Sequence, residues 1–259
     1  MSITIRKDAP SGTIMINRPD RRNALSREMI REIRIAIEDF QQERSVRAII
    51  LTGAGDTFSA GTDLQQVQET AASNEPYQQW HSDAQEFQDL IEYMLRFPKL
   101  IISSINGPVV GSGLALVLAS DIVVASEQAS ISTPEPKLGL CSGLAAALLG
   151  FRIGAGQASY ILTTGQKFDA KRCHELGLFH ELVQDHLVWA RCQELSKSIA
   201  SGARHSFHLI KQMLNETMGE SLFTHLAVGS AHTASARMSE EATEGIKAFL
   251  ENREPDWEP

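Results

Sequence analysis

The stretch "INGPVVGSGLALVLASDIVVAS", residues 105–126, holds the pattern that decides the fold. It continues the nearly unbroken apolar run "KLIISSI" at 99–105, which is typical of a buried parallel strand. A glycine-rich turn follows, then a helix of small and apolar residues at 111–120, and then a second strand at 121–126. Strand, turn, helix and strand in this order predict a βαβ unit in an α/β protein.

The same alternation runs back to the N-terminus. The segments "ITIRK" at 3–7 and "GTIMIN" at 12–17 predict a hairpin, and "VRAIILTG" at 46–53 predicts another buried strand. A long helix is expected at 77–97. Its apolar stripe recurs every three or four residues and consists of Tyr77, Trp80, Ala84, Phe87, Ile91 and Met94.

Beyond Ser142 the pattern is mostly helical. Three helices are expected at 143–153, 156–164 and 169–177, and four longer ones end near Asn252. The sequence therefore predicts parallel βαβ units followed by a helical region.

Composition narrows the class of protein. The 259 residues carry a formal net charge of -8 and no cluster of Lys and Arg, which makes nucleic acid a poor partner. The three cysteines form no C-x-x-C pair, so no zinc site or disulfide framework is indicated. The sequence contains no signal-peptide core and no apolar run long enough to span a bilayer. We expect a cytoplasmic protein without membrane association.

Two glycine-containing turns each follow a predicted strand and open a helix. One is "FSAGTDL" at 58–64 and the other is "GPVVGSG" at 107–113. Turns of this kind leave backbone N–H groups unpaired, and two neighbouring turns could aim two N–H groups at one oxyanion. The alternative is that the glycines serve only close backbone packing. Neither turn completes the dinucleotide-binding pattern G-x-G-x-x-G or the nucleophile elbow G-x-S-x-G.

The order of motifs resembles the crotonase superfamily, the enoyl-CoA hydratase/isomerase family, over nearly the whole chain. The matching segments are "INRPDRRNALS" at 16–26, "FSAGTDL" at 58–64, the stretch at 105–126, "TPEPKLGL" at 133–140, "ILTTGQKFDAKRCHELGLFHELV" at 161–183 and "SEEATEGIKAFLENREP" at 239–255. The resemblance implies a ββα spiral core at 1–200, for acyl-CoA binding and catalysis. It also implies a C-terminal helical oligomerisation region at 201–259, with a homotrimer or a dimer of trimers.

The resemblance also implies the site. The backbone N–H groups of Thr62 and Ser112 would form the oxyanion hole for the thioester, and Glu135 would be the catalytic base. No metal and no cofactor beyond the coenzyme A of the substrate is implied. Contacts to the substrate and its CoA are expected from Arg22, Ala24, Ala60, Gly61, Asp63, Leu64, Gly111, Pro134 and Gly143. For Asp63, loop organisation or helix capping is favoured over chemistry.

One departure from the family pattern bears on the reaction. Hydratases of the family carry two glutamates, and here Ala115 occupies the first position while Glu135 keeps the second. Moving a double bond requires one base that takes and returns a proton, whereas adding water is served by two carboxylates. The sequence therefore favours a 3-enoyl to 2-enoyl isomerase. The alternatives are a hydratase or other lyase with a different second acid, a serine hydrolase using Ser112, and an acyl-CoA-binding protein without activity.

Overall fold

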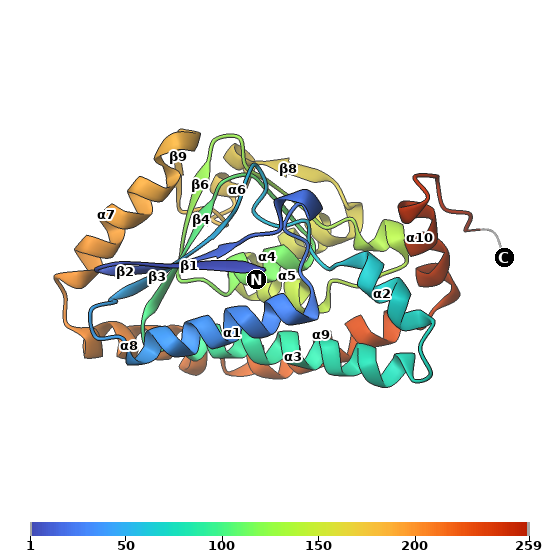
Figure 1. The fold of residues 1–259 in the computed structure, drawn as a ribbon, viewed down its shortest axis with the longest axis horizontal. Coiled ribbons are helices and arrows are strands. Elements are labelled where there is room, and N and C mark those ends of the chain that lie inside the picture. The colour runs from blue at the N-terminus through green and yellow to red at the C-terminus, as the bar shows by residue number, and fades with distance from the viewer. Residues whose placement is uncertain (1, 258–259) are drawn as a thin grey trace.

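The computed structural model describes residues 2–257, so Met1, Glu258 and Pro259 of the ranges predicted above lie outside the described residues. Two sheets form the framework (Figure 1). The larger has the order β1-β2-β3-β4-β6-β9, with β1 and β2 antiparallel and its other neighbouring strands parallel. The smaller has the order β5-β7-β8, and β7 and β8 in it are antiparallel.

The strands are β1 (Ile3–Asp8), β2 (Ser11–Ile16), β3 (Ala48–Gly53), β4 (Leu100–Ile105), β5 (Pro108–Val110), β6 (Ile122–Ser126), β7 (Ser130–Ser132), β8 (Lys167–Asp169) and β9 (Glu181–Val183). The helices are α1 (Arg27–Gln42), α2 (Leu64–Ala71), α3 (Pro76–Arg96), α4 (Ser112–Leu118), α5 (Gly143–Thr164), α6 (Ala170–Glu175), α7 (Val188–Ala200), α8 (Arg204–Gln212), α9 (Glu220–Ala236) and α10 (Glu240–Leu250), with short turns η1 (Pro19–Arg21), η2 (Glu135–Leu138), η3 (Asp185–Leu187) and η4 (Met213–Thr217). The predicted hairpin, the long helix and the four late helices are all present.

The central strand β3 of the larger sheet is covered on both faces, which explains why all six of its residues are buried. Ile49 and Leu51 of β3 pack into the main core, while Ile50, between them, packs with residues of α7 on the opposite face. Successive strand residues point to opposite faces, so a sheet covered on both sides needs apolar residues at every position.

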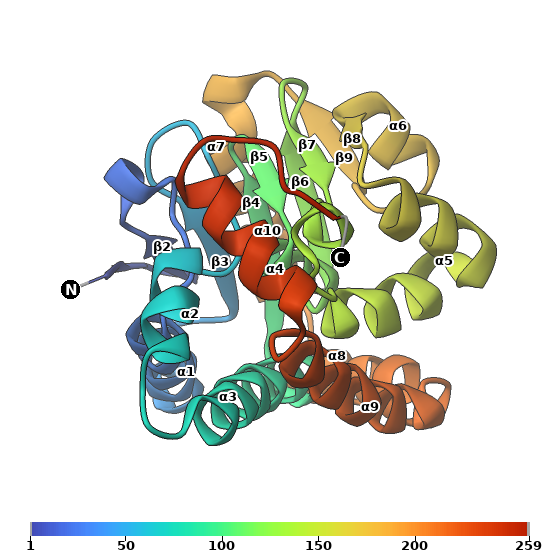
Figure 2. The ribbon, with the colours of Figure 1, turned by 90° about the vertical axis from the view of Figure 1, so that its right-hand side faces the viewer.

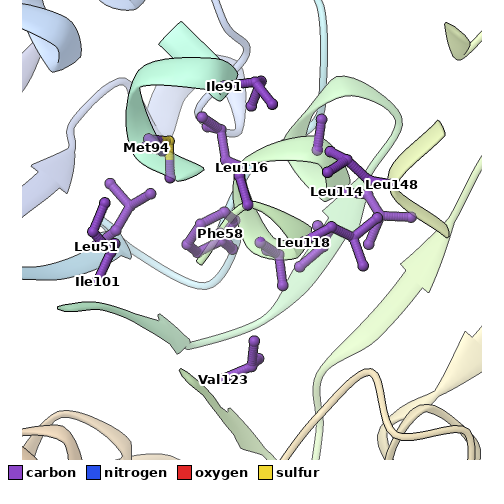
Figure 3. Close-up of a cluster of buried hydrophobic side chains, with 14 of the residues drawn as sticks. Leu51, Phe58, Ile91, Met94, Ile101, Leu114, Leu116, Leu118, Val123 and Leu148 are labelled. Carbon is purple, nitrogen blue, oxygen red and sulfur yellow. The ribbon is translucent and has the colours of Figure 1, made fainter. Parts of the chain in front are cut away.

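Helix α4 lies inside the main core. Leu114, Leu116 and Leu118 are buried, and Phe58, from the turn before α2, lies among them (Figure 3). A helix that is apolar all round is stable only when protein surrounds it. This burial holds the turn at Gly111 in place.

The predicted stripe of the long helix is confirmed except at its first position. Trp80, Phe87 and Met94 are buried, but Tyr77 is 50% exposed. Tyr77 lies in the first turn of α3, before the helix reaches the core.

The chain beyond Ser142 is mostly helical, as expected, but two strands in it were not predicted. The chain there also forms β8 and β9, three residues each, at the edges of their sheets. Both are too short and too exposed to produce an apolar run. The two helices expected at 143–153 and 156–164 are both present within α5, which is broken between them at Gly154 with a non-helical φ 78° and ψ 156°.

The C-terminal helices do not form a separate layer. Helix α9 packs against α3 and α5, and α10 crosses back to pack against α2 and η2 (Figure 2). The end of the chain therefore supports the turn that carries Glu135. Within residues 2–257, no helix is both long and apolar enough to cross a membrane.

Candidate active site

The two glycine turns meet directly. Gly61 has φ +84°, and a β-carbon there would come within 2.8 Å of Val110 O and 3.3 Å of Ser112 N. The side chains after the glycines also touch, since Thr62 Oγ1 and Ser112 Oγ lie 2.6 Å apart. The structure therefore brings together the two segments that the sequence analysis paired.

The backbone N–H groups of Thr62 and Ser112 are available to a ligand. Gly61 O and Asp63 N bond to Leu25, but among the described residues the N–H groups of Thr62 and Ser112 donate no hydrogen bond. Ser112 opens α4, where the first N–H groups have no partner within the helix.

Glu135 lies over the second turn. A β-carbon on Gly111, which has φ +52°, would fall 2.1 Å from Glu135 Oε1. Only glycine leaves room for the carboxyl group at this point. Glu135 opens η2, and its backbone carbonyl accepts from Leu140 N at 2.8 Å.

The carboxyl group of Glu135 is desolvated. Its Oε2 atom is buried and has no hydrogen-bond partner among residues 2–257, although the residue as a whole is partly exposed. Burial raises the pKa of Glu135, and its own backbone N–H and the nearby Ser142 hydroxyl oppose that rise less strongly. Ser142 Oγ itself makes no hydrogen bond of normal geometry to any residue that the structure describes.

Two adjoining chambers open around these groups. The glutamate-side chamber is bordered by Gly111 and Glu135, and the helix-side chamber by Ala115 and by residues of α1 and α3. The residues that border both are Thr62, Val67, Ser112, Cys141, Thr233 and Arg237. The unpaired backbone N–H groups of Thr62 and Ser112 thus lie where the two chambers join.

Most residues predicted from the sequence line these chambers. The glutamate-side chamber includes Ala60, Gly61, Thr62, Leu64, Gly111, Ser112, Pro134 and Glu135. The helix-side chamber includes Thr62, Asp63, Ser112 and Gly143. Arg22 and Ala24 line neither chamber, but Arg22 O accepts from Ala60 N at 2.9 Å, beside the first turn.

Asp63 has the structural role that was favoured for it. Its carboxylate accepts from Gln66 N at 3.4 Å at the start of α2, and from Arg18 Nη1 at 2.9 Å. These contacts fix the first turn between two loops.

Several lining residues were missed by the sequence analysis. Arg27, Asp83 and Arg237 form an ionic cluster in the helix-side chamber, and Cys141 and Thr233 border both chambers. They come from segments that carry no motif, so only their convergence in space identifies them. Burial, and then the charge of Glu135, raises the pKa of Cys141 and disfavours a reactive thiolate.

Ser112 has no visible activating base. Neither chamber is lined by a histidine or a lysine, within the part of the chain that the structure describes. Nor are any three His, Cys, Asp or Glu side chains of residues 2–257 grouped so that they could hold a metal ion.

The fold and the site together define an α/β protein of the crotonase class. The sequence model of the enoyl-CoA hydratase/isomerase family matches residues 8–259, and the chain belongs to that family. This confirms the resemblance and the fold class inferred from the motifs.

Similar proteins agree with this assignment. The chain is 29% identical over 246 residues to the 1,2-epoxyphenylacetyl-CoA isomerase of Escherichia coli, covering 95% of this chain and 94% of that protein. It is 30% identical to the mouse enoyl-CoA hydratase domain-containing protein 3, mitochondrial, covering 94% and 80%. A crystal structure of an enoyl-CoA hydratase/isomerase from Xanthobacter autotrophicus superposes with a TM-score of 0.89 at 25% identity, covering 97% and 94%. The chain is thus a hydratase/isomerase-type enzyme of acyl-CoA thioesters.

The raised pKa of Glu135 predicts a pH dependence of stability. Below the ordinary pKa of 4.5, Glu135 is protonated in both the folded and the unfolded chain, so its burial as an acid does not lower the free energy of unfolding. As pH rises from there through the raised pKa, only the unfolded chain ionises freely. The free energy of unfolding therefore falls by about 1.4 kcal/mol for each unit by which folding raises the pKa. Glu135→Gln is therefore expected to match the wild type near pH 4 and to be the more stable protein at neutral pH. Thermal midpoints across this range, at one protein concentration, test it, and a pH-independent difference contradicts it.

Proposed function

We propose that this protein moves the double bond of a 3-enoyl-CoA to give the 2-enoyl-CoA, with Glu135 as the single base. The observation that carries the proposal is the desolvated carboxyl group of Glu135 held against Gly111, beside the unpaired N–H groups of Thr62 and Ser112. A thioester oxygen placed between those N–H groups would be stabilised as it gains negative charge.

The reaction needs one proton to leave and one to return. Glu135 takes the proton from C2, the electron pair spreads over the thioester as a dienolate, and the two N–H groups bind its oxygen. Glu135 then delivers the proton to C4, and the double bond lies between C2 and C3. No proton is gained or lost overall, so one carboxyl group is sufficient. Proton transfer of this kind needs no metal or redox cofactor, and the coenzyme A enters as part of the substrate.

Two acids border the same chamber as Ala115, Asp63 and Asp83. Asp63 is held by Arg18 Nη1 and Gln66 N. This leaves Asp83 as the candidate second acid. Its Oδ1 already accepts from Arg27 Nε at 2.5 Å and from Gln79 Nε2 at 2.8 Å. A carboxylate held in this way is poorly placed to activate water. This favours isomerisation over hydration.

We also propose an oligomeric state and a cellular compartment for this protein. Apolar side chains of α8 and η4, including Leu209, Ile210 and Met213, are about half exposed and border a shallow groove. Such a surface is typical of a subunit contact, and we propose a homotrimer or a dimer of trimers formed largely by residues 201–259. Three free cysteines suit a reducing compartment such as the cytoplasm.

NMR in heavy water, with a 3-enoyl-CoA and a 2-enoyl-CoA as substrates, tests the function. Bond migration with deuterium appearing at C2 or C4 is the expected result. Water addition to the 2-enoyl-CoA would identify a hydratase instead, and release of free CoA a hydrolase. Thermal stabilisation by both thioesters without any conversion would identify a binding protein.

A further inference from the structure

An ionic cluster joins three helices at the helix-side chamber. Arg27 stands on α1, Asp83 on α3 and Arg237 directly after α9, and these helices lie side by side in Figure 1. Arg27 Nε is 2.5 Å from Asp83 Oδ1, whereas Arg237 Nη1 is 3.9 Å from Asp83 Oδ2. All three residues line the chamber.

Arg237 is the unsatisfied member of the cluster. Its side chain is only 9% exposed, yet within residues 2–257 its guanidinium donates no hydrogen bond. Arg27, by contrast, donates to Asp83, and also to Thr70 Oγ1. Arginine carries five N–H donors, and nine-tenths burial without acceptors is costly.

The charges of the chamber also leave Arg237 unbalanced. Asp83 is the only anion near two arginines in this cluster, and Asp63, the other acid of the chamber, is paired with Arg18 at 2.9 Å. Burial lowers the pKa of Arg237 to about 10, with Asp83 opposing the shift and Arg27 adding to it. Because Asp63 is held by Arg18, the cluster of Arg27, Asp83 and Arg237 is left with one net positive charge at the chamber wall.

Arg237 stands close to the reacting part of the site. It borders both chambers, as Thr62 and Ser112 do. A ligand whose thioester oxygen lies between the two N–H groups would place the next few carbon atoms of its acyl chain in reach of this guanidinium.

On the basis that the protein binds acyl-CoA thioesters, as proposed above, we infer that its acyl group ends in a carboxylate that pairs with Arg237. The substrate class is then the CoA monothioesters of short dicarboxylic acids. A carboxylate neutralises the charge and accepts two parallel hydrogen bonds from a guanidinium. A methyl-ended chain would enclose the cation without neutralising its charge or accepting its hydrogen bonds. A carbonyl or hydroxyl oxygen would accept a hydrogen bond but would leave the charge without a counter-ion.

Equilibrium binding of saturated thioesters tests this inference. These compounds cannot isomerise, so the result does not depend on the proposed reaction. Calorimetry would compare methyl-ended and carboxylate-ended acyl-CoAs with four, five and six acyl carbons. At one length at least, the wild type is expected to bind the carboxylate-ended ester about tenfold or more tightly than its methyl-ended partner. Equal or weaker binding of the carboxylate at all three lengths overturns the inference, whatever the variants do.

Variants separate a ligand contact from a structural role. Arg237→Met should abolish the preference, because carboxylate-ended esters bind more weakly while methyl-ended esters bind as tightly as to the wild type or more tightly, and Arg237→Lys should restore part of the preference. In Arg237→Met, Asp83 still forms its ion pair with Arg27, so the ligand-free protein should be as stable as the wild type or more stable. The matched control is Arg31→Met, which removes an exposed ion pair to Glu86 between the same helices α1 and α3 and should change no affinity. A lower thermal midpoint in Arg237→Met with the preference intact would assign Arg237 to holding the helices together and would overturn the inference.

Discussion

Glu135→Gln is expected to lower kcat for double-bond migration by about 10²–10⁴-fold, the range typical of a lost general base. Glutamine has nearly the same size and shape as glutamate, so it fits the space above Gly111 that excludes even a β-carbon. Binding of a saturated acyl-CoA should therefore stay within about threefold of the wild type, because the substitution removes the base without emptying the chamber.

Steady-state kinetics on a 3-enoyl-CoA and calorimetry with a saturated analogue measure the two effects separately. Glu127→Gln is a suitable control, since Glu127 is exposed and lines neither chamber. A near-normal kcat in Glu135→Gln would exclude Glu135 as the base. An equal loss of binding and turnover would mean that Glu135 holds the site together.

The fold could be predicted because its central strands β3 and β4 are mostly apolar on both faces and its turns carry glycine. The run at 99–126 gives strand, turn, helix and strand in order, and β4, α4 and β6 follow that order. Strands β8 and β9 could not be predicted in the same way. They are short edge strands whose pairing depends on β7 and β6, which are distant in the sequence.

The site could be predicted only where motifs carry it. The glycine turns indicated Thr62 and Ser112, and the resemblance indicated Glu135 from a turn that otherwise looks like an exposed loop. The burial of Glu135 depends on Gly111 and on the packing of α10 on η2, neither of which is local to it. Arg237 had no local signal either, because its position beside Asp83 arises only when α9 packs on α3.

Ser112→Pro is expected to reduce kcat by about 10²–10³-fold, the usual cost of one oxyanion-hole donor, or about 3 kcal/mol of barrier. Proline removes the backbone N–H at this residue. Ser112 is the first residue of α4 and follows its N-cap Gly111, a position where proline is well tolerated because that N–H makes no helical bond. The helix should therefore keep its place in the core, which the thermal midpoint would check.

Ser112→Ala is the matched partner, because it keeps the N–H and removes only the hydroxyl. The hydroxyl contacts Thr62 Oγ1 at 2.6 Å, and its loss should cost no more than about tenfold in kcat, the size of one ordinary hydrogen bond. Equal loss in both variants would transfer the role from the amide to the hydroxyl and support a serine nucleophile. Normal activity in both would mean that the thioester oxygen lies elsewhere. A large loss in kcat in Ser112→Pro alone is the result expected if the backbone N–H of Ser112 binds the oxyanion. Because the proline ring carbon takes the place of the amide hydrogen, unchanged binding of a saturated acyl-CoA must accompany that loss; weakened binding would assign the loss to blockage of the site and not to the missing donor.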